Sequence, residues 1–270
     1  MRFVKWAFNK KQGHFFFLLV AIWLGLETNH EKQIFNNLAQ AVKTNSANKN
    51  DTALVLCALE QTWNLMHQRA TIFRGLEKLS INQKLFGGAD KDLMYGSGAC
   101  GGYSMVFANT LKTMGLPVRI AQLKLTNGVW GGHIVIEYYS STLNKWVMID
   151  PLFQYVAHTQ SGWLNAKEAA QQWEQLEEVP QELYSKFRFV DVRYTNWDKY
   201  HGLFKPLRWL LRIIRGEEYT STFSMRVYLL NKVQWLFVPL FVLYGYYWWV
   251  LSIQYLKHER RRAARLGLNH

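Results

Sequence analysis

Three residues in the middle of the chain have the types and positions needed for thiol chemistry. Cys100 follows a glycine-rich segment and precedes a helical pattern, His133 opens a β-rich run, and Asp150 closes the next one. A cysteine at a helix N-terminus feels the positive end of the helix dipole, which lowers the thiol pKa and favours the thiolate. If the two runs pair as a hairpin, the carboxylate of Asp150 can orient the imidazole of His133. The order of these residues along the chain therefore predicts a nucleophile at Cys100, a general base at His133 and an orienting carboxylate at Asp150.

The glycines around Cys100 fit the same prediction. Gly98, Gly101 and Gly102 permit a sharp turn and a close approach of substrate to the backbone. Backbone N–H groups near the thiol would then be free to stabilise an oxyanion. Each of the three residues also has an ordinary explanation, as a buried thiol, a strand histidine or an aspartate in a turn. Their order and their places at element ends favour an assembled triad.

The elements that must position these residues read as helices followed by strands, which predicts an α+β fold. Helical periodicity covers residues 51–79 and Tyr103–Met114, and the runs after them are typical of an antiparallel meander. The expected strands are Val118–Leu125, Ile134–Tyr139, Trp146–Ile149 and Phe187–Tyr194, with a helix over Asn165–Gln175. The expected buried face of the first helix consists of Leu54, Ala58, Leu65, Ile72, Leu76 and Leu79, with Cys57 beside it as a core thiol.

The sequence from Gly96 to Pro151 resembles the core of the transglutaminase-like superfamily. The resemblance rests on GSGACGGYSMVFANTLKTMGLPVRIAQL and on GGHIVIEYYSSTLNKWVMIDP. It implies a papain-like core in which Cys100 is the nucleophile, His133 the general base and Asp150 the orienting residue. Members include calcium-dependent crosslinkers, peptidases, peptide N-glycanases and inactive scaffolds, so the resemblance implies a class of chemistry and leaves the substrate open.

Other features separate the chain from the calcium-dependent crosslinkers. No acidic loop has calcium-ligand spacing, and His67 and His158 have no partner at zinc-ligand spacing, so we expect no metal and no cofactor. Those crosslinkers use a tryptophan that precedes the cysteine. Here no tryptophan lies between Trp63 and the cysteine, and Tyr95 is the candidate oxyanion donor instead. Trp130 and Tyr103 either line a cleft or belong to the core.

The net charge of +13 is concentrated in three basic segments, residues 1–14, 199–215 and 257–270. A near-neutral body between basic segments argues against a nucleic-acid-binding domain. The stretch Val233–Leu256 has no formal charge and would reach roughly 36 Å as a helix, enough to span a bilayer. The basic residues that follow it predict a cytoplasmic C-terminus.

The N-terminal membrane signal is weaker. The apolar run Phe15–Leu26 follows basic residues and is short for a span, which leaves a cleaved signal or a retained anchor. We favour the anchor, because no small-x-small cleavage site follows closely. Either outcome places the N-terminus inside and the body outside. If the run does not insert, the body is cytosolic and only the C-terminal helix anchors it.

Residues 203–216 predict an amphipathic helix just before the C-terminal span. Its two faces consist of Lys205, Arg208, Arg212 and Arg215, and of Leu203, Leu207, Leu210 and Ile214. The alternative to an interfacial position is ordinary packing on the domain. Because all four charges are basic, we favour a helix that lies on anionic headgroups.

The predicted organisation holds one domain between membrane segments. The segments are a basic anchor or signal at 1–29, a transglutaminase-like domain at 30–198, an interfacial helix at 199–216, a connector at 217–232, a transmembrane helix at 233–256 and a basic cytoplasmic tail at 257–270.

Two functions of different classes fit this organisation. The first is a membrane-anchored thiol enzyme that cleaves or transfers acyl or amide groups of peptides or proteins, on the periplasmic side of a bacterial inner membrane. In it, Cys100 forms an acyl-thioester that water or an amine resolves. The second is a non-catalytic scaffold whose cleft binds a membrane or envelope protein in a cell-envelope or polysaccharide assembly. In both, the lipid bilayer is a partner and nucleic acid is not.

Overall fold

A computed structural model of the chain divides it into two compact units. One unit comprises residues 1–30 and 232–270, and the other comprises residues 31–231. The structure describes residues 2–46, 50–72, 88–95, 99–125, 132–180, 189–197, 201–228 and 230–265. The helices are α1 (Arg2–Asn45), α2 (Asp51–Ile72), α4 (Ala89–Tyr95), α5 (Cys100–Thr113), α6 (Ala166–Gln171), α8 (His201–Thr222), α9 (Met225–Tyr228), α10 (Lys232–Trp235) and α11 (Phe237–Arg265).

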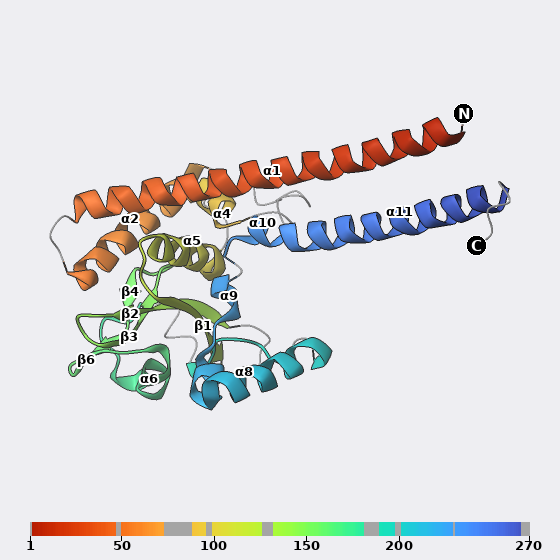
Figure 1. Ribbon diagram of the computed structural model, residues 1–270. Helices are drawn as coiled ribbons and strands as arrows, with labels where there is room; N and C mark the ends of the chain where they lie inside the picture. Colours follow the sequence, from red (N-terminus) through yellow and green to blue (C-terminus); the bar gives the residue numbers. More distant parts are fainter. Residues whose placement is uncertain are drawn as a thin grey trace. The chain divides into compact units, whose positions relative to one another are not determined.

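A five-stranded antiparallel sheet organises the larger unit, with strand order β4-β3-β2-β1-β7 (Figure 1). Its strands are β1 (Val118–Leu125), β2 (His133–Ser140), β3 (Lys145–Asp150), β4 (Tyr155–Val156) and β7 (Phe189–Arg193). The strands β5 (His158–Thr159) and β6 (Gly162–Trp163) form a separate pair. Strands β1, β2 and β3 pair in sequence, so the predicted meander and the α+β class are confirmed.

Side chains alternate across the sheet and separate two cores. On one face, Ile136 of β2 packs with Phe107 of α5 and Val55 of α2. On the other face, Leu123 of β1 packs with Leu164 and with Ala169 of α6. Helices α2 and α5 therefore cover the face from which Cys100 approaches the sheet (Figure 1).

Helix α2 buries a side that only partly overlaps the predicted one, since Ala58 is buried as expected and Leu54 and Leu65 are partly buried against the cores. Its buried residues are Val55, Ala58, Leu59, Thr62 and Met66. Ile72 is 75% exposed, and the predicted continuation from 73 to 79 lies outside the described residues. The helix contacts both α5 and α4, so its buried side is shifted by about one residue, roughly 100°, around the helix from the leucine stripe.

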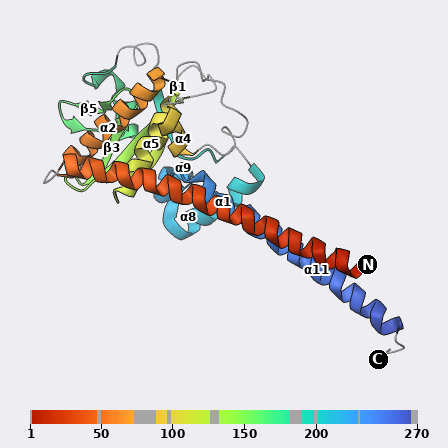
Figure 2. The same cartoon turned by 90° about the horizontal axis from the view of Figure 1, so that it is seen from above.

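Within the smaller unit, the first part of α1 and helix α11 lie side by side and run antiparallel, with both termini at the same end (Figure 2). The Nδ1 atom of His14 lies 3.0 Å from the hydroxyl of Tyr244. A Cβ added at Gly13 would lie 2.2 Å from the hydroxyl oxygen of Tyr247, so glycine permits this close approach.

In the described part of the chain, one helical stretch is long and apolar enough to span a membrane. It is Val233–Arg262, with a mean hydropathy of 1.6 and no buried residue in its most apolar window. The predicted span of 233–256 lies within it. The run Phe15–Leu26 belongs to α1 and does not meet the same criterion of length and composition, so the expected flanking pair of membrane helices reduces to one candidate.

Helix α8 contains the predicted amphipathic segment. Gly216, the expected helix end, has a φ of 85° and breaks α8 into two pieces. The apolar side chains of Trp209, Ile213 and Ile214 are each more than half exposed. Basic residues of the same helix are exposed as well, and Arg208 pairs with Glu217 beyond the break at 3.4 Å.

Candidate active site

Cys100 is the first residue of α5, three residues before the predicted start of that helix. The N-cap residue is Ala99, which has no side-chain acceptor to offer the helix. The N–H groups of the first turn are therefore left without a side-chain cap, and they direct the positive end of the helix dipole towards the thiol. The expected position of the cysteine at a helix N-terminus is thus present.

His133 is held at the start of β2, where the chain is crowded. A Cβ added at Gly132 would lie 2.3 Å from the carbonyl oxygen of Leu123. At Gly101, where we expected glycine for steric reasons, an added Cβ would make only an ordinary contact of 3.8 Å with Ile134. The close approach that requires glycine therefore lies beside the histidine.

Asp150 closes β3 and is completely buried. Its Oδ2 hydrogen bonds with Nε2 of His133, and its Oδ1 accepts the N–H of Leu152 at 3.1 Å. The carbonyl of Leu152 in turn accepts the indole N–H of Trp63 from α2, at 3.0 Å. The turn after β3 thus fixes the carboxylate, which fixes the imidazole.

The thiol of Cys100 completes the cluster from the face of the sheet that α2 and α5 cover. The sulfur of Cys100 hydrogen bonds with the side chain of His133 and with the backbone N–H of Ile134. One turn along α5, the hydroxyl of Ser104 donates to the carbonyl of Ile134 at 2.9 Å. Ser104 therefore ties the cysteine's helix to the histidine's strand, and the structure brings the three predicted residues together.

The electrostatics of the cluster favour an ion pair of thiolate and imidazolium. Burial raises the pKa of the Cys100 thiol, but the hydrogen bonds from His133 and Ile134 and the imidazolium charge hold it below its ordinary value of 9.0. Burial lowers the pKa of His133, and the contacts with Asp150 and Cys100 reverse this and raise it from 6.5 to about 9. A thiolate beside an imidazolium is the nucleophile of thiol catalysis.

The remaining predicted residues take other places. Trp63 stacks on His67 with ring centroids 4.5 Å apart, and Nδ1 of His158 contacts the carbonyl of Val156. Tyr103 belongs to the core, where burial raises its pKa. Trp130, Gly98 and the side chain of Tyr95 lie outside the described residues. In the described part of the chain, no group of three His, Cys, Asp or Glu side chains is placed to hold a metal ion.

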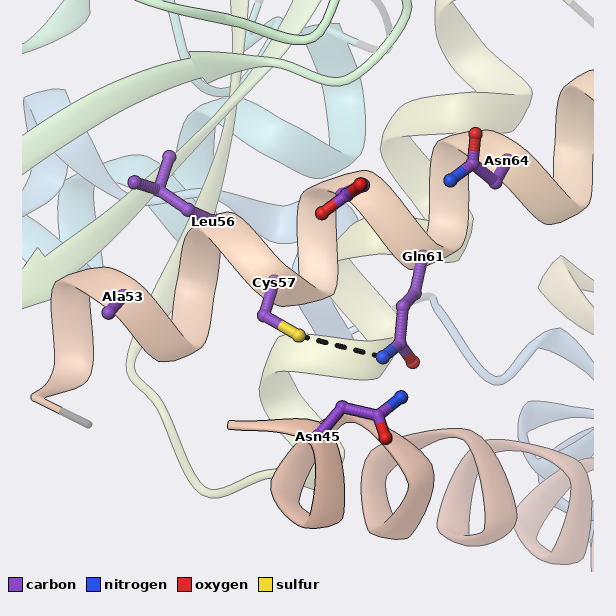
Figure 3. A pocket seen from close by; sticks show the side chains of 7 residues that line it. Asn45, Ala53, Leu56, Cys57, Gln61 and Asn64 are labelled. Carbon is purple, nitrogen blue, oxygen red and sulfur yellow. Dashed lines mark hydrogen bonds between the residues drawn. The ribbon is translucent and has the colours of Figure 1, made fainter. Parts of the chain in front are cut away.

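Cys57, the second cysteine, lies in a hollow between α2 and the end of α1 (Figure 3). The neutral amide of Gln61 donates to its sulfur at 3.5 Å, and Asn45 and Asn64 line the same hollow. It is half-buried and packs against the core, so the expected core thiol lies at the edge of that core. Gln61 carries no charge, which makes Cys57 a natural internal comparison for Cys100.

The geometry defines a mixed α and antiparallel-β domain in which a helix-terminal thiol meets a histidine and carboxylate pair. The sequence model of the transglutaminase-like superfamily matches residues 76–151. Neither the comparison with curated proteins nor that with solved structures finds a match. Residues 76–151, which hold Cys100, His133 and Asp150, therefore match the transglutaminase-like superfamily.

Replacing Gly132 by alanine should destabilise the start of β2. The new Cβ would collide with the Leu123 carbonyl, and the backbone must shift at a cost of about 1–3 kcal/mol. We expect a lower melting temperature together with slower alkylation of Cys100, because His133 moves with its neighbour. Gly101→Ala is the matched control and should melt like the wild type; equal melting of both variants would contradict the assigned crowding.

Proposed function

We propose that this protein is a membrane-anchored thiol enzyme that acts on amide bonds of peptides or proteins. The observation that carries the proposal is the hydrogen-bonded cluster of Cys100, His133 and Asp150 at one end of the sheet. A structural cysteine has no need of a buried histidine whose own orientation is fixed by a buried carboxylate.

The cluster supports acyl transfer in two steps. The thiolate of Cys100 attacks the carbonyl carbon, and the uncapped N–H groups at the start of α5 stabilise the oxyanion. The imidazolium of His133 then gives its proton to the leaving amine as the C–N bond breaks, which leaves an acyl-thioester. Water attacks the thioester in hydrolysis, and an amine attacks it in transfer, with His133 accepting the proton. Asp150 holds the imidazole in place throughout.

We propose that the helix within Val233–Arg262 anchors the enzyme in a bacterial inner membrane. In the smaller unit the first turns of α1 and the last turns of α11 lie at the same end of the helix pair, so the basic stretches 2–14 and 257–265 fall on one side (Figure 2). The preference of basic residues for the cytoplasm supports a cytoplasmic C-terminus and a periplasmic domain. The exposed apolar side of α8, next to basic residues, supports contact with anionic headgroups.

A thiol-directed acylating probe tests the enzymatic proposal. Purified full-length protein should be labelled at Cys100, the Cys57→Ala variant should be labelled like the wild type, and Cys100→Ala should lose nearly all label. Each variant removes one of the two sulfurs, so the comparison shows whether labelling depends on the activated thiol of Cys100 or on the mere accessibility of a thiol. Labelling that persists in Cys100→Ala and falls in Cys57→Ala would reject the assignment, and full cellular function of a Cys100→Ser strain would favour the scaffold.

A further inference from the structure

Two arginines converge on one side chain close to the thiol. Nη2 of Arg193, at the end of β7, donates to Oε1 of Gln122 at 2.8 Å. Nη2 of Arg226, in α9, donates to the same oxygen at 3.2 Å. In the ranges that the structure describes, neither guanidinium has a carboxylate within ion-pair distance, so one neutral amide holds two positive charges together.

The sheet register places this pair on the same face as Cys100. Arg193 of β7 lies opposite Gln122 of β1, and Gln122 lies opposite Ile134 of β2. Residues directly opposite each other on neighbouring strands point to the same face. Ile134 is the residue whose backbone hydrogen bonds with the sulfur of Cys100. The row of Arg193, Gln122 and Ile134 therefore leads across the sheet to the thiol.

Two hydroxyl groups fix the short helix that carries Arg226. Ser224 bonds through its Oγ to both the N–H and the carbonyl of Ile120 in β1, each at 2.9 Å. The hydroxyl of Thr195, just after β7, donates to the carbonyl of Phe223 and accepts the N–H of Met225. The position of Arg226 is thus built into the fold.

The arginine pair leaves hydrogen-bond donors unused. Nε of Arg193 and Nη1 of Arg226 are buried atoms without a hydrogen-bond partner. Burial and the charge of Arg193 lower the pKa of Arg226, and the negative charge of the Cys100 thiolate raises it. Like charges held together with unsatisfied buried donors are costly, and an anion between them would satisfy both the charge and the donors.

We propose that Arg193 and Arg226 form an anion-binding subsite that takes a carboxylate of the acyl substrate, next to the carbonyl that Cys100 attacks. The inference rests on the proposed function and adds the substrate class, an acidic peptide or a peptide that ends in a free carboxylate. Guanidinium groups bind carboxylates through parallel N–H donors, which gives both affinity and orientation.

A pair of alkylating reagents measures this subsite without a known substrate. Iodoacetate and iodoacetamide react with the same thiolate and differ in the carboxylate beside the reacting carbon. The ratio of their rates at Cys100, in a Cys57→Ala background of the full-length protein, reports on local binding of that carboxylate. A change in thiolate population alters both rates equally and cancels in the ratio.

We expect the ratio of iodoacetate to iodoacetamide rates to fall at least about fivefold in Arg226→Gln and in Arg193→Gln. Gln122→Glu keeps both arginines but places a carboxylate between them, so it should lower the ratio in a well-folded protein. Lys124→Gln is the matched control, since Lys124 is exposed on the same strand and already pairs with Asp191 at 2.7 Å. It should retain the wild-type ratio.

The outcomes of this experiment distinguish a failure of the anion-binding subsite from a failure of the proposed thiol enzyme. An unchanged ratio in both Arg226→Gln and Gln122→Glu would overturn the subsite and leave the thiol enzyme standing. A Cys100 that reacts with neither reagent in the wild type would overturn the proposed function and the subsite together. A ratio that falls equally in Lys124→Gln would reduce the effect to general surface charge and would also reject the subsite.

Discussion

Replacing His133 by alanine should slow the alkylation of Cys100 by iodoacetamide at pH 7, by about tenfold for each unit that the pKa of the thiol rises. The contact with His133 holds the pKa of the thiol below its ordinary value, so a larger share of the wild-type thiol is thiolate at this pH than in a free cysteine. Without the histidine, burial and the charge of Asp150 raise the pKa of the thiol and only the N–H of Ile134 still lowers it, so the share of thiolate at pH 7 falls.

The pH dependence of the alkylation rate distinguishes the loss of the contact with His133 from a general disturbance of the fold. In the wild type, the pair consists of thiolate and imidazolium from the lowered pKa of the thiol up to the pKa of His133 at about 9. The rate should therefore level off at a lower pH in the wild type than in His133→Ala, because the pKa of the wild-type thiol is the lower of the two. Measurements in a Cys57→Ala background count only Cys100. Identical profiles for the two proteins would refute the contact.

Replacing Glu137 by alanine should lower the free energy of unfolding by about 3–5 kcal/mol, because it leaves Arg119 partly buried without a counter-charge. Glu137 of β2 is completely buried, pairs with Nε of Arg119 on β1, and accepts the N–H of Ala166 at 2.7 Å. The guanidinium also lies over the ring of Trp146, 4.2 Å from its centroid. The measurement is urea unfolding of the detergent-solubilised protein followed by tryptophan fluorescence.

The neighbouring strand provides the control for this prediction. Lys145 of β3 pairs with Glu168 at 3.2 Å, and both side chains are more than one third exposed. Solvent screens that pair, so Lys145→Ala should change the free energy of unfolding by less than about 1 kcal/mol. Replacing Arg119 and Glu137 together by leucine should recover part of the loss. Equal effects of Glu137→Ala and Lys145→Ala would contradict the assigned burial.

The strands that position the site could be predicted because their signals are local. The β-rich runs of β1, β2 and β3 are separated by turns, and an antiparallel meander places the start of β2 beside the end of β3. That register alone brings His133 to Asp150. The helix dipole at Cys100 follows from its place after a glycine-rich segment. The chemistry of the three residues could thus be inferred before their contacts were known.

The parts that escaped prediction depend on contacts between distant segments. The buried side of α2 is set by two neighbouring helices, which a leucine stripe does not reveal. Arg226 lies in a helix of one turn with no periodicity, and only the bonds of Ser224 to β1 bring it to Arg193. Gly132 is required by the carbonyl of Leu123, a contact that depends on the strand register.

The bond from Ser224 to β1 also bears on solubility. Among the described residues, strand β7 pairs with residues 122–125 of β1, so the N–H and carbonyl of Ile120 face the side beyond the end of that pairing. Open strand edges of this kind recruit strands from other molecules and start aggregates. A single hydroxyl occupies both groups of Ile120, so the same serine that positions Arg226 also blocks this position of the edge against pairing with another strand.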